Sequence, residues 1–558
     1  MAQTAPTTSA SRPAEPAPGE GSPRATDGLS ERAYTGVVAA CVAAVAAFLA
    51  LRLTAWPPHE DETLALWVGH GSLADLADTV LGERGGAPLH YVFAWVVAHL
   101  GGGLGGLRLV SAVFALGSIP LTAELVRRLA DRTTAALATA LVSSSWVLLF
   151  HAVYGRMYAL FLFTSLLSYL GLLAALENGG VRRWALWVAA ILLCVATHPY
   201  GALVLASQGL FVLLVRERLR EAIAAGIAVV ALGTPFWITD LVLAGRFDVG
   251  VGGGGEKLGG PFAVAEYLGD VVADFSAGPV LLPIVLGLTG LGAWVLWRDC
   301  RRSALIALCA FAVPTAAFLV ARLGSATSPE TRHLIFTLPF FGMALATSLL
   351  TIARSERIGA RRVAAATAAA LIVGGIAWSW QKTPLLFRGE PDAQTAGRRA
   401  AAAWLLEEAQ PGDVLLGYEP VYLEAWGRDA DFSRIVLPRA DPKLATKTLR
   451  EAPRPLGRGI WIFDASDTTN KDQRLEIVRR IPRPPSAFDV RTFGPYLVIR
   501  TREPVRTPER YVELAAAAMV AGKTLAIGDA DVNFVTVDRV AQRLGYDPSA
   551  RSRSTSSR

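Results

Sequence analysis

Cysteine and charge are both scarce in this chain of 558 residues. The four cysteines all lie in or beside apolar segments and form no Cys-x-x-Cys pair, so the sequence carries neither a zinc motif nor a disulfide framework. Only 18% of the residues are charged and 52% are hydrophobic, and the mean hydropathy is +0.39. These values are too apolar for an ordinary soluble protein and predict several membrane-spanning segments.

The net charge of +7 does not indicate a nucleic-acid partner. Lysine and arginine fall mostly in short clusters between apolar runs, which is the pattern of a topology signal. The glycine-rich run at residues 249–262 lacks the G-x-x-x-x-G-K-[ST] order and follows no expected strand, so a nucleotide site is not expected there. A flexible loop that orders over a bound donor is the better interpretation of this run.

The N-terminal tail, residues 1–33, contains no sizeable apolar run and is rich in alanine, proline, threonine, serine and glycine. We expect it to be a disordered cytoplasmic tail. A secretory signal would need an apolar core near the start of the chain. The first apolar run begins near Tyr34 and is long enough to span, so it is interpreted as an uncleaved first helix.

Apolar runs with the length of membrane spans recur between residues 34 and 382. Most are near the length that crosses a hydrocarbon core of ~30 Å. They cover residues 34–51, 109–126, 133–150, 159–176, 184–197, 200–215, 222–239, 279–297, 303–320, 334–351 and 363–380.

A further apolar segment, residues 88–104, decides the orientation. If it lies at the outer interface, all the arginine clusters between the runs fall on one face, which the positive-inside rule makes cytoplasmic. The clusters are Arg127, Arg128 and Arg132; Arg182 and Arg183; Arg216, Arg218 and Arg220; Arg298, Arg301 and Arg302; and Arg354, Arg357, Arg361 and Arg362. The sequence therefore predicts about eleven spans, with the N-terminus inside and the C-terminus outside.

This topology gathers the histidines on the outer side. All seven lie in segments that it leaves outside: His59, His70, His90, His99, His151, His198 and His333. Ionisable residues that converge at membrane level indicate a functional site at the lipid boundary.

The first outer loop, residues 52–108, contains the most concentrated charge. Its segment 56–91 opens with four ionisable residues in a row, His59, Glu60, Asp61 and Glu62. Carboxylates beside a membrane are costly unless they face water or take part in chemistry.

Several short motifs follow one another in a characteristic order. They are the Asp61-Glu62 pair, PLHY at 88–91, the R-x-Y of Arg156 and Tyr158, HPYG at 198–201, and Arg332 followed by LPFF at 338–341. In this order and topology the chain resembles the GT-C superfamily of membrane glycosyltransferases over roughly residues 34–380. More narrowly it is similar to the family-39-like enzymes of the protein-mannosyltransferase and aminoarabinose-transferase type.

The resemblance implies a sugar donor carried on a polyprenyl phosphate and used outside the cytoplasmic membrane, with inversion at the anomeric carbon. It makes Asp61 the general base on an acceptor hydroxyl, and Glu62 a residue that positions the acceptor or a divalent ion. A hydroxyl is a poor nucleophile at neutral pH, so a positioned carboxylate that takes its proton is also what the chemistry requires. The need for a metal stays open, as either a metal-assisted or a metal-free reaction fits this pair.

The leaving lipid phosphate has to be held by cations as charge develops on it. Arg156 and Arg332 stand at outer ends of expected spans, where a guanidinium can bind phosphate through two hydrogen bonds. Tyr158, His198 and His333 are further candidates on this donor side.

The acceptor side is assigned to His90, Tyr91 and Lys257. The resembled family usually has His-Pro-Pro before PLYY, whereas this chain has Gly86-Ala87-Pro88 and then His90. The assignment of the acceptor side therefore has a poorer motif match than the assignment of the base.

Each of these residues also has a structural interpretation. Asp61 and Glu62 would equally suit the first turn of a helix. The two arginines would suit snorkelling membrane anchors, and His198 before proline would suit a turn.

After residue 382 the composition changes, and residues 383–546 are expected to form a small extracytoplasmic α/β domain. A helix is expected at 396–409, followed by strands in VLLGY and GIWIFD and by a hairpin of FDVRTF and YLVIRT around Gly494-Pro495. This domain is expected to cap the outer cavity and help select acceptors. Residues 547–558 are expected to be a disordered tail.

Two other classes of protein stay open at this stage. A transporter or flippase for a lipid-linked sugar would also have many spans, although transporters usually show midplane charges and repeated halves. A non-catalytic partner in cell-envelope assembly would keep the fold without needing the carboxylate. The sugar, and whether the acceptor is a lipid, a polysaccharide or a protein, do not follow from the sequence.

Overall fold

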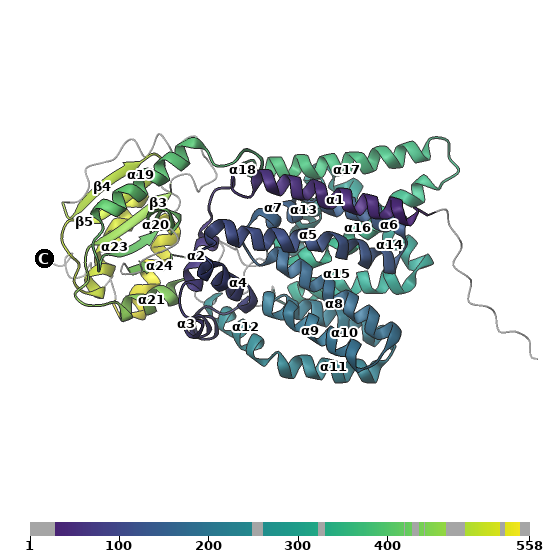
Figure 1. The fold of residues 1–558 in the computed structure, drawn as a ribbon, viewed down its shortest axis with the longest axis horizontal. Coiled ribbons are helices and arrows are strands. Elements are labelled where there is room, and N and C mark those ends of the chain that lie inside the picture. The colour runs from purple at the N-terminus through teal and green to yellow at the C-terminus, as the bar shows by residue number, and fades with distance from the viewer. Residues whose placement is uncertain are drawn as a thin grey trace, which may run out of the picture.

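The computed structural model describes residues 28–247, 261–321, 330–417, 419–426, 435–439, 441–464, 486–524 and 530–546. A bundle of long helices makes up the first part of the chain, and a mixed α/β domain stands at one end of this bundle (Figure 1). Lys257 and most of the glycine-rich run lie outside these ranges, so their expected roles stay predictions.

The bundle holds most of the apolar sequence. It consists, in chain order, of α1 (Glu31–Arg52), α5 (Gly103–Leu129), α6 (Arg132–Ser143), α7 (Trp146–Val153), α8 (Tyr158–Asn178), α9 (Val181–Thr197), α10 (Gly201–Val215), α11 (Leu219–Leu232), α12 (Thr234–Phe247), α13 (Pro261–Phe275), η2 (Pro279–Leu281), α14 (Leu282–Asp299), α15 (Arg301–Ala321), η3 (Thr331–Thr337), α16 (Leu338–Ala353) and α17 (Ala360–Lys382).

Seven helices in the described part of the chain are long and apolar enough to cross a membrane. The number rises to nine if each of two bent pairs is one span: α6 with α7, bent by 58°, and α11 with α12, bent by 59°. Helices α9 and α10, of 17 and 15 residues, occupy two more of the expected segments. The membrane character of the chain is thus clear, while the count of about eleven stays a prediction.

Burial separates the centre of the bundle from its rim. In α8 and in the span formed by η3 and α16, 72% and 78% of the apolar window is buried, against 17% in α1. The central helices pack against one another, and the rim helices leave apolar side chains on the surface, as a lipid-facing bundle requires.

The first outer loop forms a compact layer at the end of the bundle that faces the α/β domain (Figure 1). Its elements are α2 (Glu60–Gly69), α3 (Leu73–Asp78), η1 (Thr79–Arg84), a π-helical turn, and α4 (Pro88–His99). At 12 residues and about 1.5 Å per residue, α4 is too short to cross a core of ~30 Å.

The glycines before α4 set the course of the chain there. Gly85 and Gly86 have φ angles of 69° and 63°, a region that favours glycine. A Cβ at Gly85 would lie 2.3 Å from the backbone nitrogen of Leu243 in α12, and the Gly86 amide donates to the carbonyl of Thr239 at 3.0 Å. The departure from the family's His-Pro-Pro pattern thus coincides with close packing of this turn against α12.

The α/β domain carries the expected strands and hairpin. Its elements are α18 (Leu385–Arg388), α19 (Asp392–Glu408), β1 (Val414–Gly417), α20 (Glu419–Trp426), β2 (Ile435–Leu437), α21 (Pro442–Glu451), β3 (Gly459–Asp464), β4 (Phe488–Phe493), β5 (Tyr496–Thr501), α23 (Pro508–Thr524) and α24 (Ala530–Arg543). The strand order is β2-β1-β3-β5-β4. Strands β2, β1 and β3 are parallel, and β5 is antiparallel to both of its neighbours, β3 and β4.

Both faces of this sheet are covered by helices. Alternate residues of β3 enter different cores: Ile460 and Ile462 pack with α19 and α20, whereas Trp461 and Phe463 pack with α21, α23 and α24. A sheet buried on both faces explains the nearly continuous apolar sequence of β1 and β3.

The arrangement puts the outer loop and the α/β domain on one side of the bundle and the start of α1 on the other (Figure 1). Ion pairs join the helix ends on that other side, Glu31 with Arg132 at 2.7 Å and Glu217 with Arg302 at 2.8 Å. Arginines from different clusters therefore share one end of the bundle, although which side of the membrane it faces stays a prediction.

Candidate functional site

Asp61 lies in the first turn of α2, where the loop after α1 turns into the outer layer. His59 caps this helix, because its Nδ1 accepts from the Asp61 amide at 3.2 Å while the His59 amide donates to Glu62 Oε2 at 3.0 Å. His59 and Glu62 thus serve the helix terminus, and the Asp61 carboxylate is left for other contacts.

Arg156 and Tyr154 hold the Asp61 carboxylate. Arg156 Nη1 lies 3.3 Å from Asp61 Oδ1, and the side chain of Asp61 is 22% exposed. The Tyr154 hydroxyl lies 3.1 Å from Asp61 Oδ2 and 2.9 Å from His59 Nδ1. The carboxylate therefore stands between a cation and a phenol at the edge of the outer layer.

The charges around Asp61 keep it ionised. Burial alone would raise the pKa of this carboxyl group, but Arg156 above all, followed by His59, Arg332 and Arg84, holds the pKa well below its ordinary value. Burial and the neighbouring Asp61 raise the pKa of Tyr154 well above its ordinary value, so this phenol stays protonated and can donate.

Glu62 faces away from Asp61 and is fully buried. Arg108 donates to both of its oxygens, through Nε to Oε1 at 2.9 Å and through Nη2 to Oε2 at 2.8 Å. The Gly155 amide donates to Oε1 at 2.7 Å, and the His59 amide completes the set. The expected role of Glu62 beside the acceptor or a divalent ion does not fit this geometry, because protein donors already occupy both oxygens.

The Glu62–Arg108 pair instead fastens the loops that carry the site. Arg108, in α5, also donates to the carbonyls of Trp56 and Pro57 at 2.7 and 2.8 Å, which lie just before α2. Since Gly155 immediately precedes Arg156, one buried carboxylate links the start of α2, α5 and the segment that carries the guanidinium opposite Asp61.

The donor-side candidates gather around Tyr158. The guanidinium carbon of Arg332 lies 5.0 Å from the centre of the Tyr158 ring, and the rings of His198 and His333 lie 5.6 and 6.0 Å from it. The Nε atoms of Arg156 and Arg332 are buried with no hydrogen-bond partner among the residues that the structure describes. The structure thus brings the predicted cations and histidines together.

Some of these groups also have local structural partners. His198 Nδ1 accepts from the Tyr200 amide at 3.1 Å, as the turn interpretation requires. His333 Nδ1 accepts from the Glu330 amide at 3.1 Å, and Arg332 Nη2 contacts Glu330 Oε1 at 2.5 Å. The two histidines therefore help shape their turns as well as lining the cluster.

His151 belongs to this cluster and was noted in the sequence only as one outer histidine among seven. Its ring lies 4.6 Å from that of Tyr158, it is 1% exposed, and neither ring nitrogen has a hydrogen-bond partner within the described ranges. Its place in the segment HAVYGRMY, five residues before Arg156, is the sequence signal that could have singled it out.

The acceptor-side candidates lie on α4. The Tyr91 hydroxyl accepts a hydrogen bond from Arg84 Nε, and the His90 ring lies 5.6 Å from the Tyr91 ring. Burial, reinforced by Arg156 and Arg84, lowers the pKa of His90 to about 3, so the ring is neutral. Its buried Nε2 has no partner in the described part of the chain.

Arg84 is the second residue that the sequence did not single out. It ends η1, is 6% exposed, and lies near enough to Asp61 to lower its pKa. The sequence signal was its position: Arg84 stands alone in the outer loop, whereas the arginine clusters lie between later apolar runs.

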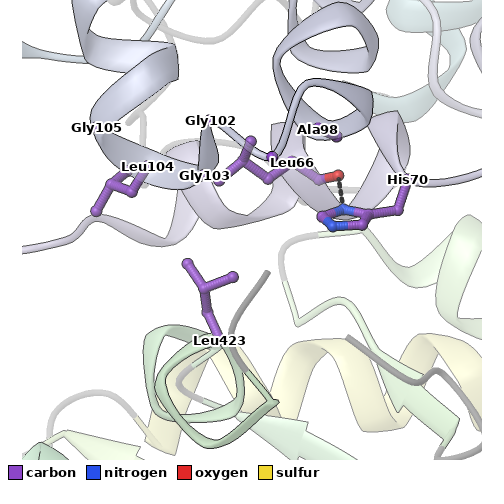
Figure 2. Close-up of a pocket in the computed structure, with 9 residues that line it drawn as sticks. Leu66, His70, Ala98, Gly102, Gly103, Leu104, Gly105 and Leu423 are labelled. Carbon is purple, nitrogen blue, oxygen red and sulfur yellow. Dashed lines mark hydrogen bonds between the residues drawn. The ribbon is translucent and has the colours of Figure 1, made fainter. Parts of the chain in front are cut away.

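A cavity of about 230 Å³ lies between the outer layer and the α/β domain. Figure 2 shows Leu66 of α2, His70 just after this helix and the glycine-rich start of α5 on one side of it and Leu423 of α20 on the other. A second cavity of about 240 Å³ shares Leu104, Gly105 and Leu423 with it. The two cavities follow the boundary between the two parts of the protein.

Among the residues that the structure describes, no three His, Cys, Asp or Glu side chains are grouped so that they could hold a metal ion. With the oxygens of Glu62 occupied and Arg156 beside Asp61, the Asp-Glu pair does not provide a metal site.

The helix bundle, the outer layer and the α/β domain together have the fold of the solved GT-C membrane glycosyltransferases. ArnT from Cupriavidus metallidurans, solved in the apo state and bound to undecaprenyl phosphate, superposes with a TM-score of 0.53 and 14% identity, over 84% of this chain and 98% of that chain.

Two further structures share this fold. They are the apo form of the Archaeoglobus fulgidus oligosaccharyltransferase (TM-score 0.50, 11% identity, 78% of this chain and 70% of that chain) and the mycobacterial arabinofuranosyltransferase AftD (TM-score 0.50, 14% identity, 85% and 40%). No protein-family model and no curated protein matches the sequence.

Proposed function

We propose that this protein transfers a sugar from a polyprenyl-phosphate donor to an acceptor hydroxyl or amine at the outer face of the cytoplasmic membrane. The observation that carries the proposal is the Asp61 carboxylate, held 3.3 Å from Arg156 beside a cluster of cations and histidines, within a GT-C fold. Its lipid-phosphate donor is supported by the fold relative that was solved with undecaprenyl phosphate.

In the proposed reaction the acceptor oxygen or nitrogen attacks the anomeric carbon as the bond from that carbon to the phosphate oxygen breaks. Asp61 takes the acceptor proton as the new bond forms. The departing lipid phosphate keeps the electron pair of the broken bond, and Arg156 and Arg332 stabilise its charge. Attack from the side opposite the phosphate inverts the anomeric configuration.

Arg156 links the two halves of this reaction. It neighbours the base, and its Nε is free within the described ranges. The negative charge of a donor phosphate next to Arg156 would offset the effect of this arginine on Asp61 and thereby raise the pKa of the carboxyl group. The base would then become stronger when the donor is in place, which couples acceptor activation to donor binding.

The donor side is completed by neutral groups. Tyr158, His198 and His333 line the cluster, and His151 adds two ring nitrogens that have no hydrogen-bond partner among the described residues. A neutral imidazole offers one N–H donor, so His151 can donate one hydrogen bond to a phosphate oxygen there.

The test is transfer from a panel of polyprenyl-phosphate sugars to a membrane extract by the purified protein and its Asp61→Asn variant, with and without a chelator. We expect Asp61→Asn to lower the transfer rate roughly 10²- to 10⁴-fold, the usual contribution of a general base. Asp78→Asn is the matched control, since Asp78 is an exposed carboxylate of the same outer loop.

Unchanged transfer by folded Asp61→Asn protein would overturn the assignment of the base. If folded wild-type protein transferred no sugar from any donor, the alternatives would be favoured: a transporter or flippase for lipid-linked sugars, or a non-catalytic cell-envelope assembly protein. Movement of the donor lipid across vesicles without transfer would distinguish the first alternative from the second.

A further inference from the structure

We infer that Asp441, in the α/β domain, is a positioning residue for the acceptor side of the site, acting on Tyr91 through Arg84. This inference rests on the proposed function. It gives the α/β domain a defined part in acceptor use, because the side chain that orients the acceptor-side arginine comes from that domain.

The contacts form a continuous chain between the two parts of the protein. Asp441 Oδ2 lies 3.0 Å from Arg84 Nη1, and Arg84 Nε donates to the Tyr91 hydroxyl. The guanidinium carbon of Arg84 also lies 5.5 Å from the centre of the Tyr91 ring. A carboxylate 357 residues away in sequence thus fixes the rotamer of the arginine that holds this tyrosine.

Burial makes this chain specific. The side chains of Asp441 and Arg84 are 0% and 7% exposed, and Tyr91 and His90 are each 4% exposed. A buried ion pair usually adds little net stability compared with apolar packing, but removal of one partner is severe because the other charge is left uncompensated. Such a pair is therefore better suited to fixing one geometry than to holding two domains together.

Other contacts hold the α/β domain against the outer loop. Lys443 Nζ donates to the carbonyl of Gly82 at 2.6 Å and pairs with Glu83 at 3.3 Å, and Lys447 Nζ pairs with Asp78 at 2.6 Å. Leu444 packs into the apolar cluster of α2 and α4. These contacts dock α21 on η1, and Asp441, the N-cap residue of α21, bonds Arg84.

The chemistry on the acceptor side follows from this orientation. With its oxygen accepting from Arg84, the Tyr91 hydroxyl keeps its own proton to donate. A hydroxyl or ring oxygen of the acceptor is a suitable partner, with the neutral His90 beside it. The charge of Arg84 also acts on Asp61, so the same arginine affects both the acceptor and the base.

The test compares Asp441→Asn with Lys447→Met. Asparagine keeps the helix cap that Asp441 provides, whose Oδ1 accepts from the Leu444 amide at 3.1 Å, because asparagine and aspartate cap about equally well. Asp441→Asn therefore removes the negative charge that faces Arg84 and keeps the cap. Lys447→Met removes an interface ion pair that does not touch Arg84.

The assay uses full-length protein, the polyprenyl-phosphate sugar that supports wild-type transfer, and a dilution series of membrane extract as the acceptor. We expect Asp441→Asn to raise the apparent acceptor KM or lower kcat/KM for the acceptor by about 10- to 100-fold, the scale of a misplaced group. The donor KM should change less than about twofold, and Lys447→Met should leave both constants unchanged.

Arg84→Met and the double variant test the route of the effect. If Asp441 acts through Arg84, the double variant should match Arg84→Met alone, because residues in one network do not contribute additively. An unchanged kcat/KM for the acceptor in Asp441→Asn, an equal rise in the donor KM, or additive effects would each overturn the inference. Absence of wild-type transfer would instead overturn the proposed function and this inference with it.

Discussion

At the scale of single residues, the pairing of Asp61 with Arg156 has a consequence for pH dependence. An opposite charge favours the ionised carboxylate, so Arg156 lowers the pKa of Asp61 and its removal must raise it. In the wild type the acid limb of kcat/KM, which reports the free enzyme, should therefore lie below the ordinary range of an aspartate.

In Arg156→Gln we expect this limb to move to higher pH, together with a lower maximal rate because the phosphate loses a cation. The measurement is kcat/KM for sugar transfer as a function of pH. Arg128→Gln at the opposite end of the bundle is the control and should leave the profile in place. A profile that is identical in Arg156→Gln and wild type would mean that Asp61 is not the titrating base.

The residue scale also shows where inference from the sequence stopped. Asp61 was selected because the resemblance assigns the base to that position, and Arg156 and Arg332 because the chemistry demands cations at the outer boundary. The direction in which the Glu62 side chain points could not be predicted. Consecutive residues of a helix point about 100° apart, and the sequence does not say which of them faces the site. Arg84 was missed for a different reason: its partner Asp441 lies 357 residues away in the sequence, in another domain.

At the scale of structural elements, the Glu62–Arg108 pair joins α2, α5 and the turn before Arg156. Both side chains are at most 2% exposed, so breaking the pair leaves a buried charge without its partner. We expect Glu62→Gln to lower the free energy of unfolding by about 3–5 kcal/mol, whereas Asp61→Asn should leave it nearly unchanged.

Thermal unfolding of the detergent-solubilised protein would measure this difference. Glu124→Gln is a suitable comparison, because Glu124 forms an ion pair that is 30% exposed and such pairs are worth about 0–1 kcal/mol. A fully stable Glu62→Gln protein that had nevertheless lost transfer would place Glu62 in the chemistry instead of the scaffold.

The helices and strands that could be predicted are those with a clear length and a clear periodicity of apolar residues in the sequence. The hairpin of β4 and β5 and the helix α19 were predictable, because alternation and turn residues are local signals. The bend between α6 and α7 was not, since the sequence offers one continuous apolar run at residues 133–150. Ser144 bonds back to the carbonyl of Leu141 at 2.9 Å and Ser145 bonds to that of Asp274 at 3.2 Å, and the second of these contacts is long-range.

At the scale of the whole molecule, the proposed orientation makes a prediction about a native thiol. Cys300 is exposed in the turn between α14 and α15, flanked by arginines that the positive-inside rule assigns to the cytoplasm. A membrane-impermeant maleimide should label Cys300 only after the cell membrane is permeabilised.

A cysteine introduced as Asp78→Cys in the outer layer is the matched control and should react in intact cells. The comparison is made in a background lacking Cys41, the other cysteine with partial exposure. Labelling of Cys300 in intact cells would reverse the orientation and move the site, with the α/β domain, to the cytoplasmic side.

The docking of α21 on η1 bears on how proteins of this fold diverge. Asp78, Glu83 and Arg84 on one side each face a charged residue on the other, so neither surface can change its charge pattern alone without opposing like charges or leaving one buried. We therefore expect the outer loop and the α/β domain of this protein to work only as a matched pair, so that an α/β domain grafted from another protein of this fold would need its own outer loop to come with it.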